Sequence, residues 1–404
     1  MVNNTVGKSA WYNVSVLTAA HFMSDFYAVF LPPLLPFLMT KLGMSLTMSG
    51  ILVMVNSVVS SVFQPVCGYY IDKSGYSWLL IFTLPVSAVF ICVAGLVESQ
   101  AALFAVVVLS GLAITIFHPL GSSLVGRVTP ETGKGRAMSV FIFGGNVGCA
   151  VSPAVVVWLL ADYGAGSLLW LIVPGLIVTW LCYQAGLHQV AVASPSLEIS
   201  SAPCSSRPWY KSGSLLLLNA VMALRSWAQI VISTFLPVML IQLGYPAAIS
   251  GSMLFVFMFA AAIGGVIGGH IGDKFGGKNC IVWLLLISLP AAYWFFQTRE
   301  ITWLSWVALA VAGAALQGVL PPSIVWAQEL LPDNAAMASG MMLGLSFGLG
   351  GIGAAITGAL ADHAGVQPAL MWTLISVILA LLLAAVIPDP RRQSAAIRQE
   401  AGSL

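Results

Sequence analysis

The sequence predicts an all-α membrane protein whose twelve transmembrane helices form two six-helix bundles, with both termini in the cytoplasm. Of its 404 residues, 59% are hydrophobic and only 7% are charged, whereas a soluble domain has about 25% charged residues. Twelve apolar stretches follow one another along the chain, and a spanning helix needs about 20 residues. Short motifs of the first half also recur in the second half. We therefore expect lipid to cover the chain and its halves to be repeats of one unit.

The apolar stretches give the expected order of the spans. The longest polar connection, at about 188–212, is rich in Ser and Pro and predicts a flexible cytoplasmic linker. It separates an N-terminal bundle at 1–187 from a C-terminal bundle at 213–404, which ends in a short cytoplasmic tail. The twelve spans are expected near 12–40, 46–71, 77–97, 101–126, 135–161, 167–187, 213–242, 247–271, 279–297, 301–328, 335–361 and 366–387.

Lysine and arginine residues gather on one side of these spans. With both termini in the cytoplasm, only Lys41 and Arg299 lie outside, and Arg225 lies within the seventh span. Cytoplasmic loops carry the excess of positive residues in membrane proteins, which predicts this orientation. The other basic residues are then cytoplasmic: Lys8, Lys73, Arg127, Lys134, Arg136, Arg207, Lys211, Lys274, Lys278, Arg391, Arg392 and Arg398.

The two halves resemble each other at a constant offset. GYYIDKSG follows the second span and GHIGDKFG follows the eighth, so that 201 residues separate Asp72 from Asp273. The same offset relates residues 42–43 to 243–244, which are Leu-Gly in both places. Several matches at one offset predict two parallel repeats about an axis along the membrane normal, with a substrate site between them.

Two ionisable side chains lie in the middle of the first span. His21 and Asp25 are four residues apart, so they point from one face of a helix. A carboxylate at the centre of a span costs at least about 2.5 kcal/mol to insert, and such a group faces water or partners. We expect the pair to couple transport to protons, since both side chains can change protonation state. Alternatively, His21 only orients Asp25.

The matching position in the seventh span places a cation at the same depth. The offset carries Asp25 to Ser226, beside Arg225, so the acid and the base would line one cavity from opposite walls. Arg225 would bind an anionic substrate or pair with Asp25, because intramembrane ionisable groups are functional by default. The alternative is a structural ion pair.

Four further polar residues are candidates for the cavity. His118 precedes Pro119 in the fourth span, where it could contact substrate or bond to the carbonyls that the proline frees. Asn56 and Gln64 in the second span and Gln317 in the tenth could also contact substrate, or only bond a neighbouring helix. A metal site would need His21, Asp25 and His118 together, and we expect none.

The repeated turns at the cytoplasmic ends of the second and eighth spans predict a different role. Their glycines permit tight turns and close helix approach, and their charges could pair across helices and hold the halves in one state. The expected gating residues are Gly68, Asp72, Lys73, Gly75, Asp273, Lys274 and Gly276.

These motifs resemble the major facilitator superfamily, and in particular its fosmidomycin resistance protein family of efflux transporters. The matching segments include AHFMSD at 20–25, FHPLGSS at 117–123 and FGGNVG at 143–148. The resemblance implies the major facilitator fold, a cell inner membrane and export of drugs coupled to proton entry. It also implies that His21, Asp25 and His118 match the family's intramembrane polar residues. Fosmidomycin is a small phosphonate, which would suit a cation such as Arg225.

The leading hypothesis is therefore a proton-coupled secondary exporter of a small amphiphilic or anionic compound, working as a monomer on the proton gradient without a cofactor. A proton-coupled uptake symporter, or an exporter of an endogenous metabolite or metallophore, is the alternative.

An enzyme or an ATP-driven pump is not expected, because nucleophile–base, metalloprotease and phosphate-loop motifs do not occur. The net charge of +2 gives no basis for nucleic-acid binding. The six cysteines include no C-x-x-C pair, so a disulfide framework is not expected either.

Overall fold

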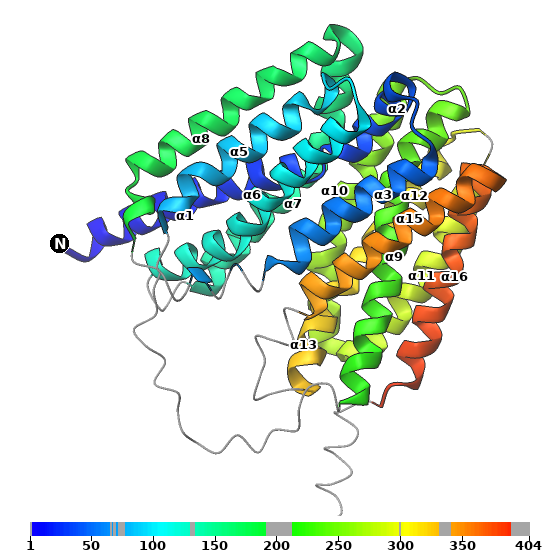
Figure 1. Ribbon diagram of the computed structural model, residues 1–404. Coiled ribbons are helices and arrows are strands. Elements are labelled where there is room, and N and C mark those ends of the chain that lie inside the picture. Colours follow the sequence, from blue (N-terminus) through cyan, green and yellow to red (C-terminus); the bar gives the residue numbers. More distant parts are fainter. Residues whose placement is uncertain are drawn as a thin grey trace, which may run out of the picture.

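The computed structural model describes residues 2–64, 67, 70–71, 77–129, 134–190, 212–298, 300–330 and 341–388, and this part of the chain consists of helices joined by short turns (Figure 1). Short 3₁₀ or π-helical turns extend several helices, among them Val58–Val62 after α3 and Met341–Leu345 before α15. The α-helices are α1 (Val2–Ala28), α2 (Leu31–Leu42), α3 (Leu46–Ser57), α5 (Leu80–Cys92), α6 (Gln100–Val128), α7 (Lys134–Tyr163), α8 (Ile172–Gln184), α9 (Gly213–Gln242), α10 (Ala247–Phe275), α11 (Gly277–Gln297), α12 (Trp303–Gly318), α13 (Leu320–Leu330), α15 (Ser346–Ala364) and α16 (Val366–Val386).

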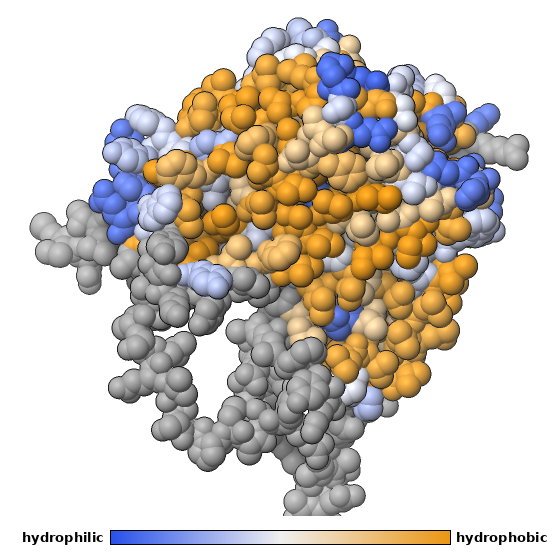
Figure 2. All heavy atoms as spheres, viewed as in Figure 1, coloured by the Kyte–Doolittle hydropathy of each residue, from blue (hydrophilic) through white to orange (hydrophobic). Residues whose placement is uncertain are grey.

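The described helices have the lengths and surfaces of a membrane protein. Ten of them are long and apolar enough to cross a bilayer, and a shorter apolar helix covers Leu46–Val62. Large apolar side chains point outward on many helices, for example Trp303 at 76% exposure and Val266 at 69%. Figure 2 shows apolar residues over most of the visible face, with hydrophilic residues towards its edges. An apolar outer surface of this extent would be unfavourable in water. It is the surface expected of a protein that lipid covers.

Prolines divide two of the expected spans into shorter helices. The first span is broken between Ala28 and Leu31, where α2 begins with prolines in its first turn. The tenth span is broken at Val319, just before the Pro321-Pro322 pair of α13. Proline lacks a backbone N–H and fits only the first turn of a helix without disrupting it. Both breaks come directly before prolines, whereas single prolines elsewhere, such as Pro119 in α6 and Pro153 in α7, lie inside helices that continue.

Helices from the first and second halves of the chain pack closely against each other. α3 lies along α15, and α7 lies along α10 (Figure 1). A Cβ added at Gly50 would collide with the backbone of Ala354, and one at Gly358 would collide with the backbone of Leu46. Small residues allow helix backbones to approach this closely in membranes. The α3–α15 contact thus closes one end of the molecule, at the turn between α2 and α3.

A carboxylate at the end of α15 binds the first turn of α3. Asp362 accepts hydrogen bonds from the backbone N–H groups of Leu46 and Thr47, each at 2.8 Å, and from the Thr47 hydroxyl. Partial burial raises the pKa of Asp362, but the hydrogen bonds, led by those of Thr47, outweigh it and hold the pKa below its usual value. An acidic group is favoured at a helix N-terminus because unpaired N–H groups and the helix dipole meet there. Asp362 therefore fastens the second half of the chain to the first.

Candidate functional site

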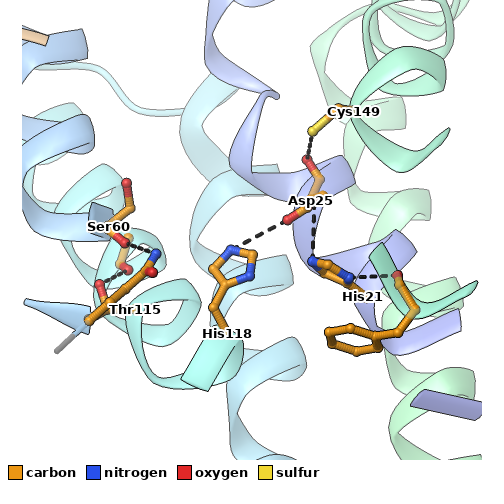
Figure 3. A network of polar contacts seen from close by, with 9 residues as sticks. His21, Asp25, Ser60, Thr115, His118 and Cys149 are labelled. Atoms are coloured by element: carbon orange, nitrogen blue, oxygen red, sulfur yellow. Dashed lines mark hydrogen bonds and ion pairs between the residues drawn. The ribbon is translucent and has the colours of Figure 1, made fainter. Parts of the chain in front are cut away.

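The intramembrane acid of the first span lies between two histidines. Asp25 Oδ2 is 3.3 Å from His21 Nε2, and Asp25 Oδ1 is 3.4 Å from His118 Nε2 (Figure 3). His21 and Asp25 come from α1, and His118 comes from α6. The side chains of His21 and Asp25 are only 9% and 15% exposed. The spacing of His21 and Asp25 predicted their shared face, and the fold adds His118 to them.

Helix α7 holds this cluster in place. His21 Nδ1 is 2.8 Å from the carbonyl oxygen of Phe141, and the two rings stack with centroids 4.1 Å apart. Gly145 lies one turn further along α7, and a Cβ there would press against Asp25 Oδ2 and the His21 ring. The glycines of the fifth predicted span therefore serve the close approach of α7 to α1, as small residues do between membrane helices.

The contacts of the cluster indicate where its protons would lie. The Phe141 carbonyl can only accept, so His21 Nδ1 must hold a hydrogen. Each contact between a ring nitrogen and an Asp25 oxygen is attractive only if a proton lies between the two atoms. The contacts of His21 with the Phe141 carbonyl, of His21 with Asp25 and of His118 with Asp25 each need one proton, which makes three. Two neutral imidazoles and an ionised carboxylate together hold only two protons. This arrangement therefore suits a cluster that carries one additional proton, between His21 and Asp25.

Two imidazoles and a carboxylate could also serve as metal ligands. The ligand atoms of His21, Asp25 and His118 lie within 4.8 Å of one another. Such a donor set binds several transition metals. The contacts within the cluster already account for these atoms, so the geometry does not require a metal.

A cavity of about 260 Å³ lies between the two halves of the chain. Its polar lining consists of hydroxyl, amide and thiol groups, and no charged residue is among the described residues that line it. Cys149 lines the cavity and also contacts the backbone carbonyl of Asp25 at 3.9 Å, so the cavity lies beside the part of α1 that carries the cluster. The polar lining residues are Asn56, Ser57, Ser60, Ser61, Asn146, Cys149, Gln229, Ser233, Thr234 and Gln317.

Arg225 lies behind the wall of this cavity on the side of the second half. It is fully buried, and its guanidinium donates to the carbonyl of Leu316 at 2.6 Å, to Ser226 Oγ at 3.2 Å and to Gln317 Oε1 at 2.6 Å. The described residues provide no carboxylate within ion-pairing distance, and Asp25 contacts the histidines instead. The two charges thus lie behind opposite walls, whereas the sequence predicted that both would project into the cavity. The rotation of each helix about its axis decides whether its charged side chain faces the cavity. That rotation cannot be read from a single sequence.

The other predicted substrate contacts divide in the same way. Gln317 and Asn56 line the cavity. Gln64 does not line it, and its amide donates at 2.7 Å to the carbonyl of Ser60, one turn earlier in the same segment, so this bond is neither the predicted substrate contact nor the alternative bond to a neighbouring helix. Asn146 and Gln229 also line the cavity but were not predicted, although an amide inside an apolar span is itself the signal that could have found them.

The predicted gating residues are only partly described. Gly276 joins α10 to α11 with a φ of 88°, a backbone conformation that favours glycine. Lys274 lies at the end of α10, with its ammonium 5.4 Å from the centroid of the Phe275 ring. Gly68, Asp72, Lys73, Gly75 and the side chain of Asp273 lie outside the described residues, so their role as a latch remains a prediction.

Comparison with known proteins places the chain in a large group of transporters. The family model of the Major Facilitator Superfamily matches residues 17–352 and, in a second match, residues 215–403. The chain is 27% identical to the fosmidomycin resistance protein of Escherichia coli (strain K12), over 97% of this chain and 96% of the relative. It is 29% identical to the uncharacterized MFS-type transporter YfnC of Bacillus subtilis (strain 168), over 96% of this chain and 95% of that one.

Solved structures show the same fold at lower sequence identity. A bacterial homologue of the human lysosomal transporter Spinster, in an inward-facing and occupied conformation, superposes with a TM-score of 0.79 at 14% identity, covering 93% of this chain and 96% of that chain. The nucleoside transporter NupG superposes with a TM-score of 0.75 at 15% identity, covering 93% and 99%.

Proposed function

The chain belongs to the Major Facilitator Superfamily, and we propose that within it the protein exports a small compound, anionic like fosmidomycin, in exchange for protons. It is a transporter and not an enzyme. The fosmidomycin resistance protein, which is similar along almost its whole length, supports the direction and the substrate class. The proton gradient is the driving force, no cofactor takes part, and the protein works as a monomer.

The histidine cluster is the observation that carries the proposal of proton coupling. In this proposal His21, Asp25 and His118 together accept one proton beyond the two that neutral imidazoles and a carboxylate hold, and the contact of His21 Nδ1 with the Phe141 carbonyl supports it. Loading and release of that proton change the charge of a nearly dry site by one unit. A charge inside the membrane is costly, so the loaded and empty clusters favour different arrangements of α1, α6 and α7. This difference would link proton movement to alternating access.

The cavity and its closed end support the transport path. Asp362 and the α3–α15 contact close the end at the α2–α3 turn, which is the outer end in the orientation that the basic residues predict. The compound would then enter the cavity from the cytoplasm and leave after this end opens. We further propose that the protein lies in the inner membrane, crosses it twelve times and has both termini in the cytoplasm.

Everted membrane vesicles test the proposal. Vesicles that contain the protein are acidified inside, and fosmidomycin is added outside. We expect accumulation of the compound with release of protons from the vesicles. Asp25→Asn should abolish the proton dependence, because an amide cannot take up the proton. Asp162→Asn is the matched control, since Asp162 is an exposed acid near the end of α7.

Two results would contradict the exporter. Accumulation that continues after the proton gradient is collapsed would exclude proton coupling. Faster uptake of the compound into intact cells that contain the protein would assign symport in place of export.

A further inference from the structure

Arg225 is a buried cation that has no negative partner among the described residues. It is fully buried, and its three hydrogen bonds go to a carbonyl, a hydroxyl and an amide of the described residues. Placing an arginine in the middle of a span costs at least about 2.5 kcal/mol, and a buried charge normally has a counter-ion. An anion in the adjacent cavity would supply this missing charge.

Gln317 is the side chain that lies between this cation and the cavity. A guanidinium has only donors, so the amide oxygen of Gln317 must face Arg225, as it does at 2.6 Å. The amino group of the same amide then points away from Arg225, and Gln317 lines the cavity. A hydrogen bond from a cation polarises the amide and makes its N–H groups stronger donors. Gln317 thus presents the positive charge to the cavity indirectly.

The surrounding wall prepares the same place for a polar occupant. Phe347 lines the cavity, and its ring centroid is 5.5 Å from Arg225 Cζ, so the ring helps to separate the cation from the cavity. Two buried atoms of α9 that belong to lining residues, Gln229 Oε1 and Thr234 Oγ1, have no hydrogen-bond partner in the described part of the chain. Buried polar atoms without a partner indicate a ligand or water that bonds them.

We propose that Gln317 recognises a negatively charged oxygen of the exported compound and that Arg225 is a positioning residue that acts through it. The inference rests on the proposed export function and specifies its substrate as a small oxyanion of the phosphonate type. Gln317 donates to the anionic oxygen. Arg225 fixes the orientation of the amide and supplies the positive potential. Gln229 and Thr234 bond the polar remainder of the compound.

Binding to the purified protein tests this subsite without relying on transport. The probes are fosmidomycin and methylphosphonate, with neutral dimethyl methylphosphonate for comparison, and the readout is the ligand-induced rise in unfolding temperature in detergent. We expect the wild type to bind the two anions and not the ester. Gln317→Leu should weaken anion binding by about 10- to 100-fold, the effect of losing a hydrogen bond to a charged group.

A second variant separates recognition from folding. Gln317→Glu places a carboxylate beside Arg225 and neutralises it, so anion binding should be lost while the unfolding temperature without ligand stays at or above that of the wild type. Gln242→Leu, at the exposed end of α9, should bind the anions as the wild type does. Unchanged anion binding by both Gln317 variants, or no anion binding by the wild type, would overturn the proposal. Intact binding together with transport that ignores the proton gradient would overturn the proposed function and leave the subsite standing.

Discussion

At the scale of single residues, the space beside Asp25 decides whether the proton site can form. A Cβ on Gly145 would contact Asp25 Oδ2 and come within 2.7 Å of the His21 ring, closer than van der Waals contact allows. We therefore expect Gly145→Ala to separate His21 from Asp25 and to reduce proton-coupled transport at least about tenfold, the effect of misplacing a proton carrier. Proton release from everted vesicles measures this.

A glycine on a neighbouring helix provides the control for Gly145. Gly126 lies in α6, and a Cβ there would meet no atom within 4 Å. Gly126→Ala should retain transport and stabilise α6 slightly, by about 0.5–1 kcal/mol, because alanine has less freedom to lose than glycine. Equal loss of transport in both variants would show that α6 and α7 respond to any added methyl group and not to the geometry of the cluster.

The same scale shows what the sequence can and cannot predict about the site. The four-residue spacing of His21 and Asp25 predicts their common face, and the structure has them in contact. The contact of His118 with Asp25 depends on how α6 packs against α1, and the burial of Arg225 depends on the rotation of α9. Neither quantity is encoded in local spacing, because an apolar helix in lipid is apolar on all sides.

At the scale of helices, the contact of Asp362 with α3 joins the two halves at one end of the molecule, which we propose opens during transport. The ionised carboxylate stabilises this contact, and its pKa lies below the usual 3.8. The stabilisation is therefore complete above the usual pKa and is lost as the pH falls through the lowered value. Asp362→Asn removes the charge at every pH, and for an exposed residue at a helix N-terminus this is worth about 1 kcal/mol.

Spectroscopic distances can measure the effect of Asp362→Asn. Spin labels at Thr40 and Glu300, exposed residues of the two halves near this end, should report a larger share of molecules with the end open. A loss of about 1 kcal/mol corresponds to an increase of about fivefold in the ratio of open to closed molecules. An unchanged distance distribution at pH 7 would show that the glycine contacts between α3 and α15 alone keep this end closed.

The breaks within the first and tenth spans were not predicted from the sequence. Prolines follow both breaks, at the start of α2 and α13, but prolines also lie inside helices that continue, such as Pro119 in α6 and Pro153 in α7, so a proline alone does not locate a break. The glycines of the eleventh predicted span indicated tight packing, and the structure divides that packing between α3, which Gly351 and Gly358 face, and α9, which Gly350 and Gly353 face. The partner helix could not be predicted because a small residue specifies close approach and not its partner.

At the scale of the whole molecule, the membrane orientation remains to be measured. We expect twelve spans with both termini in the cytoplasm, because the basic residues gather there. A fluorescent protein fused after Leu404 should fluoresce, since it matures only in the cytoplasm. Alkaline phosphatase fused after Glu98, in an outer turn, should be active. Phosphatase activity from a fusion after Leu404 would reverse the orientation.

The general fold was the most predictable property of this protein. Composition, apolar stretches and the repeated Asp-Lys turns together indicated a two-part helical transporter, and the family match and the structural similarities agree with a Major Facilitator fold. The division at 188–212 remains a prediction, since most of that segment lies outside the described residues. Hydrophobic length determines the helices well, because lipid leaves the backbone few alternatives.

The buried position of Arg225 has a consequence for ion leakage. A fixed positive charge beside the cavity raises the electrostatic energy of any hydronium or sodium ion that enters, as an arginine does in water-conducting pores. If the protein exchanges a compound for protons as proposed, Arg225 would keep stray cations out of the route of the compound, and protons would cross only at the histidines. One side chain would in this way protect the membrane potential that drives the proposed exchange.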